Sequence, residues 1–299
     1  MFVKSPKLIV ILGPTATGKT KLAVDLASKF NGEIVSADSR QIYKGMDIGT
    51  GKDMKEYKKI KYHLINVVNP NTNYNLVKYK RKALKTIKDI TKRNKIPFLV
   101  GGTGLYISSI IDNYQIPPVK PDKKIREKIN KLDKNEQIKL LMELDRESLK
   151  FIDTDNPRRL ERALEVCLNG QKFSTYRRKQ SKPLFNVLQI GLTFPREEIN
   201  KKINKRVDEM IKTGLIKETE KIIKKYGRKS APLETIGYTE IIDYLNKKTI
   251  PLSGTIQLIK THTHQFAKRQ MTWFKRDRNI NWVKNKTQAN KLIRKFLNQ

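Results

Sequence analysis

The sequence has almost none of the residues that build disulfides or zinc sites. Cys167 is the only cysteine, and the 299 residues include three histidines. A single cysteine excludes a disulfide within the chain and any zinc site made of several cysteines, as is common in a reducing cytosol. The apolar run "LIVIL" is far too short to span a membrane, and "MFVKSPK" does not have the character of a signal peptide. We therefore expect a cytoplasmic protein without a membrane partner.

Acidic residues are also scarce. The chain contains 29 Asp and Glu against 64 Lys and Arg, which gives a formal net charge of +35. A field of this sign attracts nucleic acid or an anionic membrane surface. The many lysine, asparagine and isoleucine residues offer a second explanation, a bias of composition that adds surface lysines with no binding role. The charge favours a nucleic-acid partner without establishing one.

Two glycines stand in a phosphate-binding pattern. "GPTATGKT" comes after the apolar run "KLIVIL" and before a helical pattern that reaches about Phe30. A match to G-x-x-x-x-G-K-[ST] between a strand and a helix predicts a loop whose backbone N–H groups surround phosphate oxygens. Lys19 would add positive charge, and Thr20 a hydroxyl ligand for Mg2+. This phosphate loop consists of Gly13, Pro14, Thr15, Ala16, Thr17, Gly18, Lys19 and Thr20.

The order of apolar runs predicts an α/β fold, a P-loop NTPase-like parallel sheet flanked by helices. "KLIVIL", "GEIVSAD" and "IPFLVGGTG" have the character of buried parallel strands, and the helical stretch "LVKYKRKALKTIKDITKRN" precedes the third. A further strand is expected in "NVLQIGLTF", followed by helices to the end. Ligands bind beyond the carboxyl ends of such strands, so we expect Asp38 and Thr103 beside the phosphate loop.

The middle of the chain has a different pattern. Three prolines in "YQIPPVKPD" interrupt it, and the sequence that follows is helical and highly charged to about Lys179. We predict a helical insertion domain at residues 117–185, within a core domain made of residues 1–116 and 186–299.

One acidic residue is missing where a nucleotide-hydrolysing enzyme would need it. A P-loop NTPase usually has an Asp after a second apolar strand to hold Mg2+, but "IPFLV" is followed by Gly101, Gly102 and Thr103. This difference argues against NTP hydrolysis. Asp38 is the nearest acid expected at the sheet edge. It could be a base or magnesium ligand of a kinase, a base for another nucleophile, or only the cap of a turn, which "SADS" would suit.

Two segments combine basic residues in a way that suits RNA. In "NPRRLERALEV" three arginines fall in the first turns of a helix, where positive charge opposes the helix dipole unless an anion neutralises it. In "FAKRQMTWFKRDR" basic residues alternate with Phe266, Trp273 and Phe274. Such a mixture can stack on bases and contact phosphates. For Trp273 and Phe274, packing in the core explains the pattern equally well.

Several segments, taken together and in this order, resemble the tRNA dimethylallyltransferase (tRNA isopentenyltransferase) family. They are "GPTATGKT", "VSADSRQIYKGMDIGTGK", "LVGGTGLYI", "NPRRLERALEV", "IGYTEII" and "AKRQMTWF". The resemblance extends from about Lys7 to Trp282. The lone cysteine excludes the C-terminal zinc finger that eukaryotic members often carry, which favours the bacterial type.

The resemblance implies a substrate and a reaction. The phosphate loop would bind dimethylallyl diphosphate with Mg2+ at Thr20. The dimethylallyl group would pass to N6 of adenosine 37, beside the anticodon of tRNAs that read codons beginning with U, and diphosphate would leave. Asp38 would accept the proton of the amine, while Thr103 and Arg206 would contact the diphosphate. The adenine must leave the base stack, so base flipping in an anticodon stem-loop is expected. We expect a monomer.

The resemblance also places tRNA contacts. They comprise Asp38, Ser39, Arg40 and Gln41 around the flipped base, Arg158, Arg159, Leu160, Glu161 and Arg162 at a helix start, Lys268, Arg269 and Gln270 near the C-terminus, and, by a looser alignment, Arg126. The sequence departs from the family at Thr17, where serine is common, at Thr239, where lysine is frequent, and at His264, where arginine is frequent. These departures affect single contacts rather than the reaction.

Three alternatives explain part of the pattern. A small-molecule P-loop kinase would use Lys19, Thr20 and Asp38 but would not need the basic segments. An adenylate isopentenyltransferase would use the same donor with AMP, ADP or ATP as acceptor, without needing "AKRQMTWF". A non-catalytic RNA-binding protein with a degenerate P-loop is disfavoured by the intact loop. The tRNA enzyme accounts for all of these features.

Overall fold

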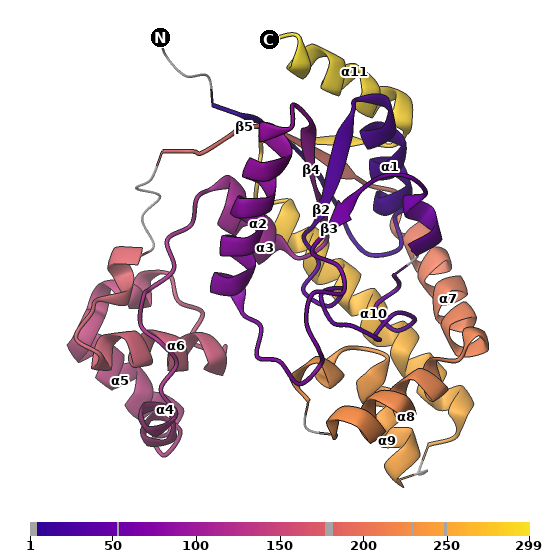
Figure 1. Ribbon diagram of the computed structural model, residues 1–299. Helices are drawn as coiled ribbons and strands as arrows, with labels where there is room; N and C mark the ends of the chain where they lie inside the picture. The colour runs from indigo at the N-terminus through magenta and orange to yellow at the C-terminus, as the bar shows by residue number, and fades with distance from the viewer. Residues whose placement is uncertain (1–4, 53, 177–181, 229, 248–249) are drawn as a thin grey trace. The chain divides into compact units, whose positions relative to one another are not determined.

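The computed structural model describes residues 5–52, 54–176, 182–228, 230–247 and 250–299. The chain forms two compact units (Figure 1). The first unit comprises residues 1–111 and 184–299, and the second runs from Asp112 to Pro183. The boundaries predicted from the sequence were residues 117 and 185. The last part of the predicted helical stretch, residues 177–181, lies outside the described residues.

The first unit is built on a parallel sheet. Its described strands are β1 (Lys7–Leu12), β2 (Gly32–Ser36), β3 (Tyr62–His63), β4 (Ile96–Gly101), β5 (Asn186–Leu192) and β6 (Ile280–Val283), in the order β3-β2-β4-β1-β5-β6. Every pair of neighbours is parallel. The predicted P-loop-like sheet is confirmed, and two details are corrected. β2 ends before Asp38. The segment "INWV" is a strand where only helices were expected. Its four residues carry a weak strand pattern, and pairing with β5 makes them a strand.

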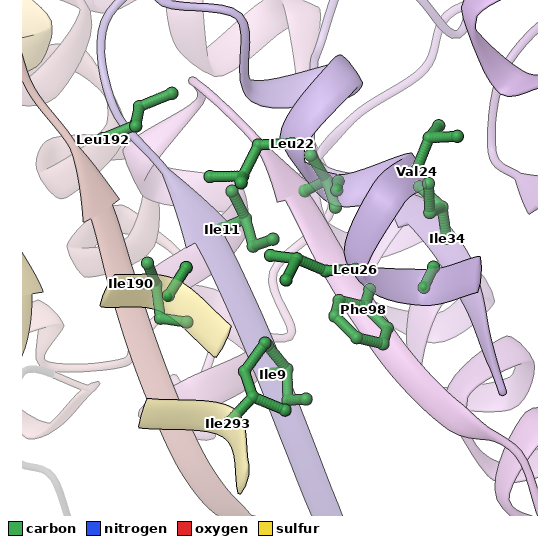
Figure 2. Close-up of a cluster of buried hydrophobic side chains, with 14 of the residues drawn as sticks. Ile9, Ile11, Leu22, Val24, Leu26, Ile34, Phe98, Ile190, Leu192 and Ile293 are labelled. Carbon is green, nitrogen blue, oxygen red and sulfur yellow. The ribbon is translucent and has the colours of Figure 1, made fainter. Parts of the chain in front are cut away.

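The first unit also contains helices, some of which cover the two faces of the sheet. They are α1 (Lys19–Lys29), α2 (Leu76–Lys92), α3 (Gly104–Ile111), α7 (Arg196–Thr213), α8 (Leu215–Tyr226), α9 (Tyr238–Lys247), α10 (Leu252–Phe274) and α11 (Lys286–Leu297). Alternate residues of β1 point to opposite faces. Ile9 and Ile11 pack with Leu26 of α1 and Ile293 of α11 on one face (Figure 2). On the other face, Leu8, Val10 and Leu12 lie in a cluster with residues of α2 and α3.

A third cluster joins the loop after β2 to the C-terminal helices. Ile42 and Met46 of this loop pack with Ile203 of α7, Leu215 of α8 and Tyr238 of α9, and all five are almost fully buried. The carboxyl end of β2 is thereby connected to helices that follow it by more than 150 residues. This packing places side chains of α7 and α10 beside the phosphate loop.

The second unit consists of helices alone in its described part. They are α4 (Lys123–Ile129), α5 (Lys134–Asp145) and α6 (Pro157–Leu168), with short 3₁₀ helices at Arg146–Lys150 and Phe173–Tyr176. Asn156 begins α6, accepting a hydrogen bond from the Arg159 N–H, and Pro157 occupies the first helical position, where it costs no hydrogen bond. Ile129, Leu141 and Leu164 form its core. Among the described residues of the whole chain, no helix is both long and apolar enough to cross a membrane.

Candidate active site

The phosphate loop connects β1 to α1, and glycine is required at both ends of it. Gly13 has a φ of 143°, and a Cβ there would lie 2.5 Å from the carbonyl oxygen of Leu192. Gly18 has a φ of 80°, which favours glycine. The Thr17 hydroxyl donates to the carbonyl of Pro14 at 2.8 Å and closes the turn. The loop therefore leads into the N-terminus of α1, where unpaired backbone N–H groups favour an anion.

Lys19 turns back over this loop. Its Nζ donates to the carbonyl of Pro14 at 2.5 Å. Burial of the ammonium group lowers the pKa of Lys19 to about 7, while the nearby charge of Asp38 raises it and that of Arg206 lowers it. An anion bound in the loop would favour the charged lysine, as a phosphate group does. Thr20 lines the same cavity as Lys19.

Asp38 lies two residues beyond β2. Its Oδ1 accepts hydrogen bonds from the backbone N–H of Arg40 at 2.8 Å and of Gln41 at 3.3 Å. Asp38 therefore caps a turn. The cap does not preclude a role as a base. Both hydrogen bonds go to Oδ1, so Oδ2 is held in one direction and can still accept a proton.

Thr103 follows β4 and is tied to the residue after Asp38. Its Oγ1 accepts the Ser39 N–H at 3.0 Å, and its hydroxyl lies 3.4 Å from the Ser39 Oγ. The carboxyl ends of β2 and β4 thus bring Asp38, Ser39 and Thr103 to one place. This is the arrangement expected from a parallel sheet with its ligands beyond the strand ends.

Arg206 reaches the phosphate loop from α7. Its Nη1 donates to the Thr15 hydroxyl at 3.3 Å, and its Nη2 to the Gly51 carbonyl at 3.2 Å. Gly51 has a φ of +60°, and a Cβ there would lie 1.3 Å from Nη2. Only glycine leaves room for the guanidinium at this point. The structure therefore brings Arg206 to the loop it was predicted to serve.

Two cavities meet at these residues. The larger cavity, of about 810 Å³, contains Lys19, Thr20 and Tyr57 in its wall. The smaller cavity, of about 520 Å³, is lined by Ser39, Arg40, Thr103, Leu105, Arg269 and Trp273. Thr15, Asp38 and Arg206 line both. A carboxylate and a guanidinium therefore stand between a phosphate-binding space and a second space of the size of a nucleobase or more.

The predicted contact residues of α10 differ in exposure and in the contacts they make. Lys268 and Arg269 are exposed, and the Arg269 guanidinium lies 6.0 Å from the ring of Phe266. Gln270 is only 8% exposed. Its Oε1 accepts the Thr15 N–H at 2.8 Å, and its Nε2 donates to the Gly102 carbonyl at 2.8 Å. Both ends of its amide therefore hold the phosphate loop to the end of β4. Gln270 also lines both cavities, and the tRNA contact expected there stays a prediction.

The aromatic residues of the same helix mostly serve the core. Phe274 is 3% exposed, and Trp273 packs against the same apolar cluster. A Cβ on Gly104 would lie 2.2 Å from the indole Nε1, so the start of α3 is also fitted to this ring. Phe266, by contrast, is 38% exposed and lines both cavities. Of the three aromatics, Phe266 lines both cavities and Trp273 lines the smaller one, so both can contact a ligand there.

Most of the contact residues predicted in the second unit are used within that unit. Arg158 and Arg159 are exposed at the start of α6. Leu160 is 1% exposed and its side chain belongs to the core, so a side-chain contact with tRNA has no support here and the assignment stays a prediction. It lies on the apolar side of an amphipathic helix whose other side carries the charges.

Arg126 and Arg162 converge on the buried carboxylate of Glu165, and Glu161 joins them. Arg126 donates to both oxygens of Glu165, at 2.8 and 3.0 Å, and lies 3.3 Å from Glu161. Arg162 donates to Glu165 and to the Pro117 and Val119 carbonyls. Burial raises the pKa of Glu165, but hydrogen bonds from both arginines outweigh it and lower the pKa to about 2. The charges of these two arginines and Glu161 are therefore largely neutralised inside the unit, and the RNA contacts expected of them stay a prediction.

The sequence analysis missed two residues that hold the loop after β2. Lys52 has a side chain with 0% exposure, and Glu218 of α8 accepts hydrogen bonds from three backbone N–H groups of the loop. The two glycines of "DIGTGK" were a signal of close packing here. Nothing local indicated that a glutamate so much later in the chain would bind them.

Comparison with known proteins gives a consistent result. A family model described as IPP transferase matches residues 41–277, and one described as isopentenyl transferase matches residues 6–65. The tRNA dimethylallyltransferase of Carboxydothermus hydrogenoformans is 43% identical over 286 residues, covering 93% of this chain and 92% of that protein. The tRNA isopentenylpyrophosphate transferase of Bacillus halodurans has a similar structure, with a TM-score of 0.75 and 33% identity over 99% of this chain and 97% of that one. A eukaryotic dimethylallyltransferase acting on tRNA has a TM-score of 0.80 and 29% identity, over 90% of this chain and 70% of that one.

Proposed function

The chain belongs to the IPP transferase family, and from this premise we propose that it transfers the dimethylallyl group of dimethylallyl diphosphate to N6 of adenosine 37 in tRNA. The tRNAs would be those that read codons beginning with U. The observation that carries the proposal is the position of Asp38, which lines both the cavity of the phosphate loop and the cavity beside it. A base at such a junction can act where donor and acceptor meet.

The larger cavity would take the donor. Backbone N–H groups of the phosphate loop, Lys19 and Arg206 would surround the diphosphate, which gains negative charge as its bond to the dimethylallyl carbon breaks. Fixed positive groups at a leaving group stabilise the transition state more than the ground state, and so raise the rate. Thr103 is hydrogen-bonded to Ser39 and lines the smaller cavity. Its hydroxyl would contact the bridging oxygen of the diphosphate.

The residues of this cavity fit a magnesium ion that arrives with the donor. No group of three His, Cys, Asp or Glu side chains in the described ranges is arranged to hold a metal by itself. Mg2+ prefers oxygen ligands and usually keeps several waters while binding substrate phosphates. The Thr20 hydroxyl and the diphosphate would supply such oxygens. When bound, the ion would neutralise part of the charge that builds on the diphosphate.

The smaller cavity would take the flipped adenine. As the new N6–C bond forms and the C–O bond to the diphosphate breaks, one N6 proton must leave. Asp38 would accept it, since its carboxylate is fixed by two backbone N–H groups at the mouth of this cavity. General bases of this kind contribute roughly 10²- to 10⁴-fold to a rate. Ser39, Arg40 and Gln41 would contact the base or its neighbours.

The exposed basic residues support contact with the tRNA backbone. Lys268 and Arg269 on α10, and Arg158 and Arg159 on α6, are exposed and can reach phosphates, which position a nucleic acid without reading its sequence. We further propose that the protein acts as a cytoplasmic monomer.

A transfer assay tests the proposal. The protein, Mg2+ and labelled dimethylallyl diphosphate are mixed with an unmodified anticodon stem-loop bearing A36-A37-A38, and with AMP and ATP as parallel acceptors. A stem-loop with guanosine at position 37 is the matched control. Label in the first RNA only is the expected result. Label in AMP or ATP would identify an adenylate isopentenyltransferase, and label in no acceptor would refute the prenyl transfer.

A further inference from the structure

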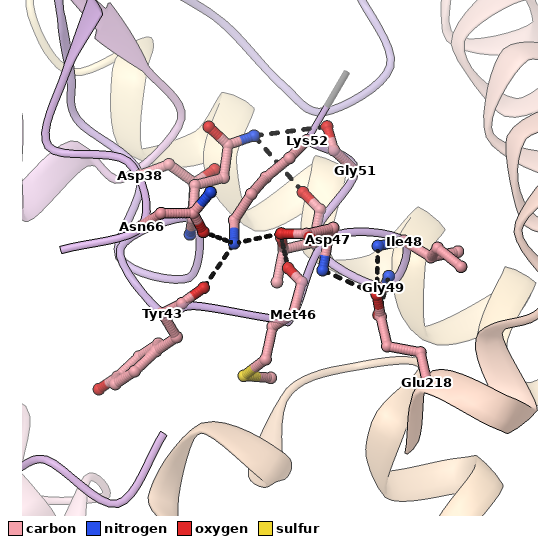
Figure 3. A network of polar contacts seen from close by, with 12 residues as sticks. Asp38, Tyr43, Met46, Asp47, Ile48, Gly49, Gly51, Lys52, Asn66 and Glu218 are labelled. Atoms are coloured by element: carbon pink, nitrogen blue, oxygen red, sulfur yellow. Dashed lines mark hydrogen bonds and ion pairs between the residues drawn. The ribbon is translucent and has the colours of Figure 1, made fainter. Parts of the chain in front are cut away.

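One carboxylate, that of Glu218 on α8, binds the loop that follows β2. Its Oε2 accepts the backbone N–H groups of Asp47 and Ile48 at 2.9 Å each, and its Oε1 accepts that of Gly49 at 3.0 Å (Figure 3). The Tyr238 hydroxyl donates to the same Oε1 at 2.6 Å. Four donors converge on two oxygens, and an ionised carboxylate is the side chain that accepts from all of them.

Lys52 holds the other end of this loop. Its buried Nζ donates to the carbonyl of Tyr43, to Asp47 Oδ1 at 2.9 Å and to Asn66 Oδ1 at 2.7 Å (Figure 3). Residues 47–51, which we call the DIGTG loop, are therefore fixed from two sides. A loop held in this way has few alternative conformations, because each would leave buried charged groups unpaired.

The DIGTG loop meets the site at Gly51. The Gly51 carbonyl accepts from Arg206 Nη2 at 3.2 Å and from the Gln41 side chain at 3.4 Å. At Gly49, a Cβ would lie 2.5 Å from the ring of Tyr238. The loop is thus packed at the level of its backbone between the Glu218–Tyr238 pair and the guanidinium that contacts the phosphate loop.

We propose that Glu218 and Tyr238 are positioning residues for the donor site. They fix the start of the DIGTG loop and thereby the position of the Gly51 carbonyl. This carbonyl accepts a hydrogen bond from Arg206 and so orients its guanidinium toward the diphosphate. Neither Glu218 nor Tyr238 is among the described residues that line the two cavities, so they act through the loop and not on the substrate. The inference rests on the proposed function, since it assigns Arg206 to a diphosphate.

A purely structural role for Glu218 makes a different prediction. If the carboxylate only stabilised the fold, its loss would lower the stability and the concentration of active enzyme, but the remaining enzyme would bind the donor normally. A positioning role requires weaker binding of the donor by folded protein. It also requires that the effect depend on Arg206, because the two act on the same ligand through one loop.

The experiment compares Glu218→Gln with Glu220→Gln. Glutamine keeps the shape of Glu218 but turns an NH2 group toward at least one N–H or O–H donor, whereas Glu220 is exposed on the same helix. We measure the affinity for inorganic pyrophosphate, the donor KM and kcat, and the Kd for the stem-loop. In Glu218→Gln we expect pyrophosphate affinity to fall, and the donor KM to rise, by roughly tenfold or more, the scale of one misplaced charged hydrogen bond. The stem-loop Kd should stay within about twofold, and Glu220→Gln should match the wild type in all three measurements.

A double-mutant cycle with Arg206→Ala completes the test. In that background, Glu218→Gln should add less than about twofold to the donor KM, because the group it positions is gone. Tyr238→Phe, which removes one of the four donors and keeps the ring, provides a milder variant with the same direction of effect should Glu218→Gln not fold. An unchanged donor KM in folded Glu218→Gln, or effects that simply multiply in the cycle, would overturn the inference. A wild-type protein that transfers no label in the same assay would overturn the proposed function, and this inference with it.

Discussion

The phosphate loop and the start of α6 both carry basic residues that the sequence singled out, yet the two regions use them differently. In the first, Lys19 donates to the Pro14 carbonyl, and Arg206 of α7 donates to the Thr15 hydroxyl and the Gly51 carbonyl, and both residues line a cavity. In the second, Arg162 of α6 and Arg126 of α4 surround the buried Glu165. A basic residue in the sequence therefore does not reveal whether its partner is a bound ligand or the protein's own carboxylate.

The largest effect should come from the junction of the two cavities. Asp38→Asn keeps the size and the turn-capping oxygen of Asp38 but removes the proton acceptor. We expect kcat to fall roughly 10²- to 10⁴-fold, with the affinities for pyrophosphate and for the stem-loop close to those of the wild type. Single-turnover kinetics with labelled donor measure the chemical step directly. Near-normal turnover would show that Asp38 acts as a cap and not as a base.

The difference between the two regions explains what could be predicted from the sequence. The phosphate loop is local, because the glycines, Lys19 and Thr20 lie within eight residues, so the pattern itself defines the geometry. The parallel sheet followed from apolar runs separated by helices. The partners of the loop are not local. Gln270 binds Thr15 across 255 residues and Glu218 binds Asp47 across 171, and no sequence spacing indicates such pairs.

At the start of α6 the sequence left the environment of each arginine open for another reason. Its helix, its cap at Asn156 and its charged face were all predictable from local signals. Which arginine faces solvent depends on the position of Glu165 relative to α4, a matter of tertiary packing. The resemblance to a family marked the whole segment as one contact region, and only Arg158 and Arg159 remain exposed in it.

The second-largest effect should be on stability, in the second unit. Glu165→Gln leaves Arg126 and Arg162 with a neutral partner in a buried place. Breaking such a pair costs roughly 3–5 kcal/mol of unfolding free energy. Glu147→Gln is the control, because Glu147 forms an exposed pair with Lys150, and exposed pairs contribute about 0–1 kcal/mol. Denaturant unfolding of both variants measures the difference, and equal losses would contradict the structural role assigned to Glu165.

The same residue predicts a pH dependence. The folded-state pKa of Glu165, about 2, lies below its ordinary value of 4.5. The stabilisation is therefore fully present above pH 4.5 and is lost as the pH falls toward 2, because the unfolded chain binds the proton first. The stability difference between wild type and Glu165→Gln should shrink over this window. A difference that stays constant from pH 5 to pH 2 would exclude a charged Glu165 as its origin.

A smaller effect is expected where the exposed basic residues meet RNA. Lys268→Ala should weaken stem-loop binding several-fold and reduce the slope of log K against log salt by about 1, as for one lost phosphate contact. Lys291→Ala on α11 removes the same charge from another exposed helix position. If both variants bind equally, net charge explains the affinity. If Lys268→Ala alone loses affinity and salt dependence, the α10 contact is specific.

The smallest effect concerns the charge of Lys19 and tests the comparison most directly. Arginine stays charged in proteins, whereas burial lowers the pKa of Lys19 to about 7 when no ligand is bound. A diphosphate should raise that pKa again, so binding takes up a proton, about half of one at pH 7 and nearly a whole one at pH 8.5. Calorimetry of pyrophosphate binding in buffers of different ionisation enthalpy counts the protons. The variant Lys19→Arg stays charged throughout, so it measures the proton uptake that comes from the pyrophosphate itself. Identical proton uptake in the two proteins would mean that Lys19 is already charged before the ligand binds.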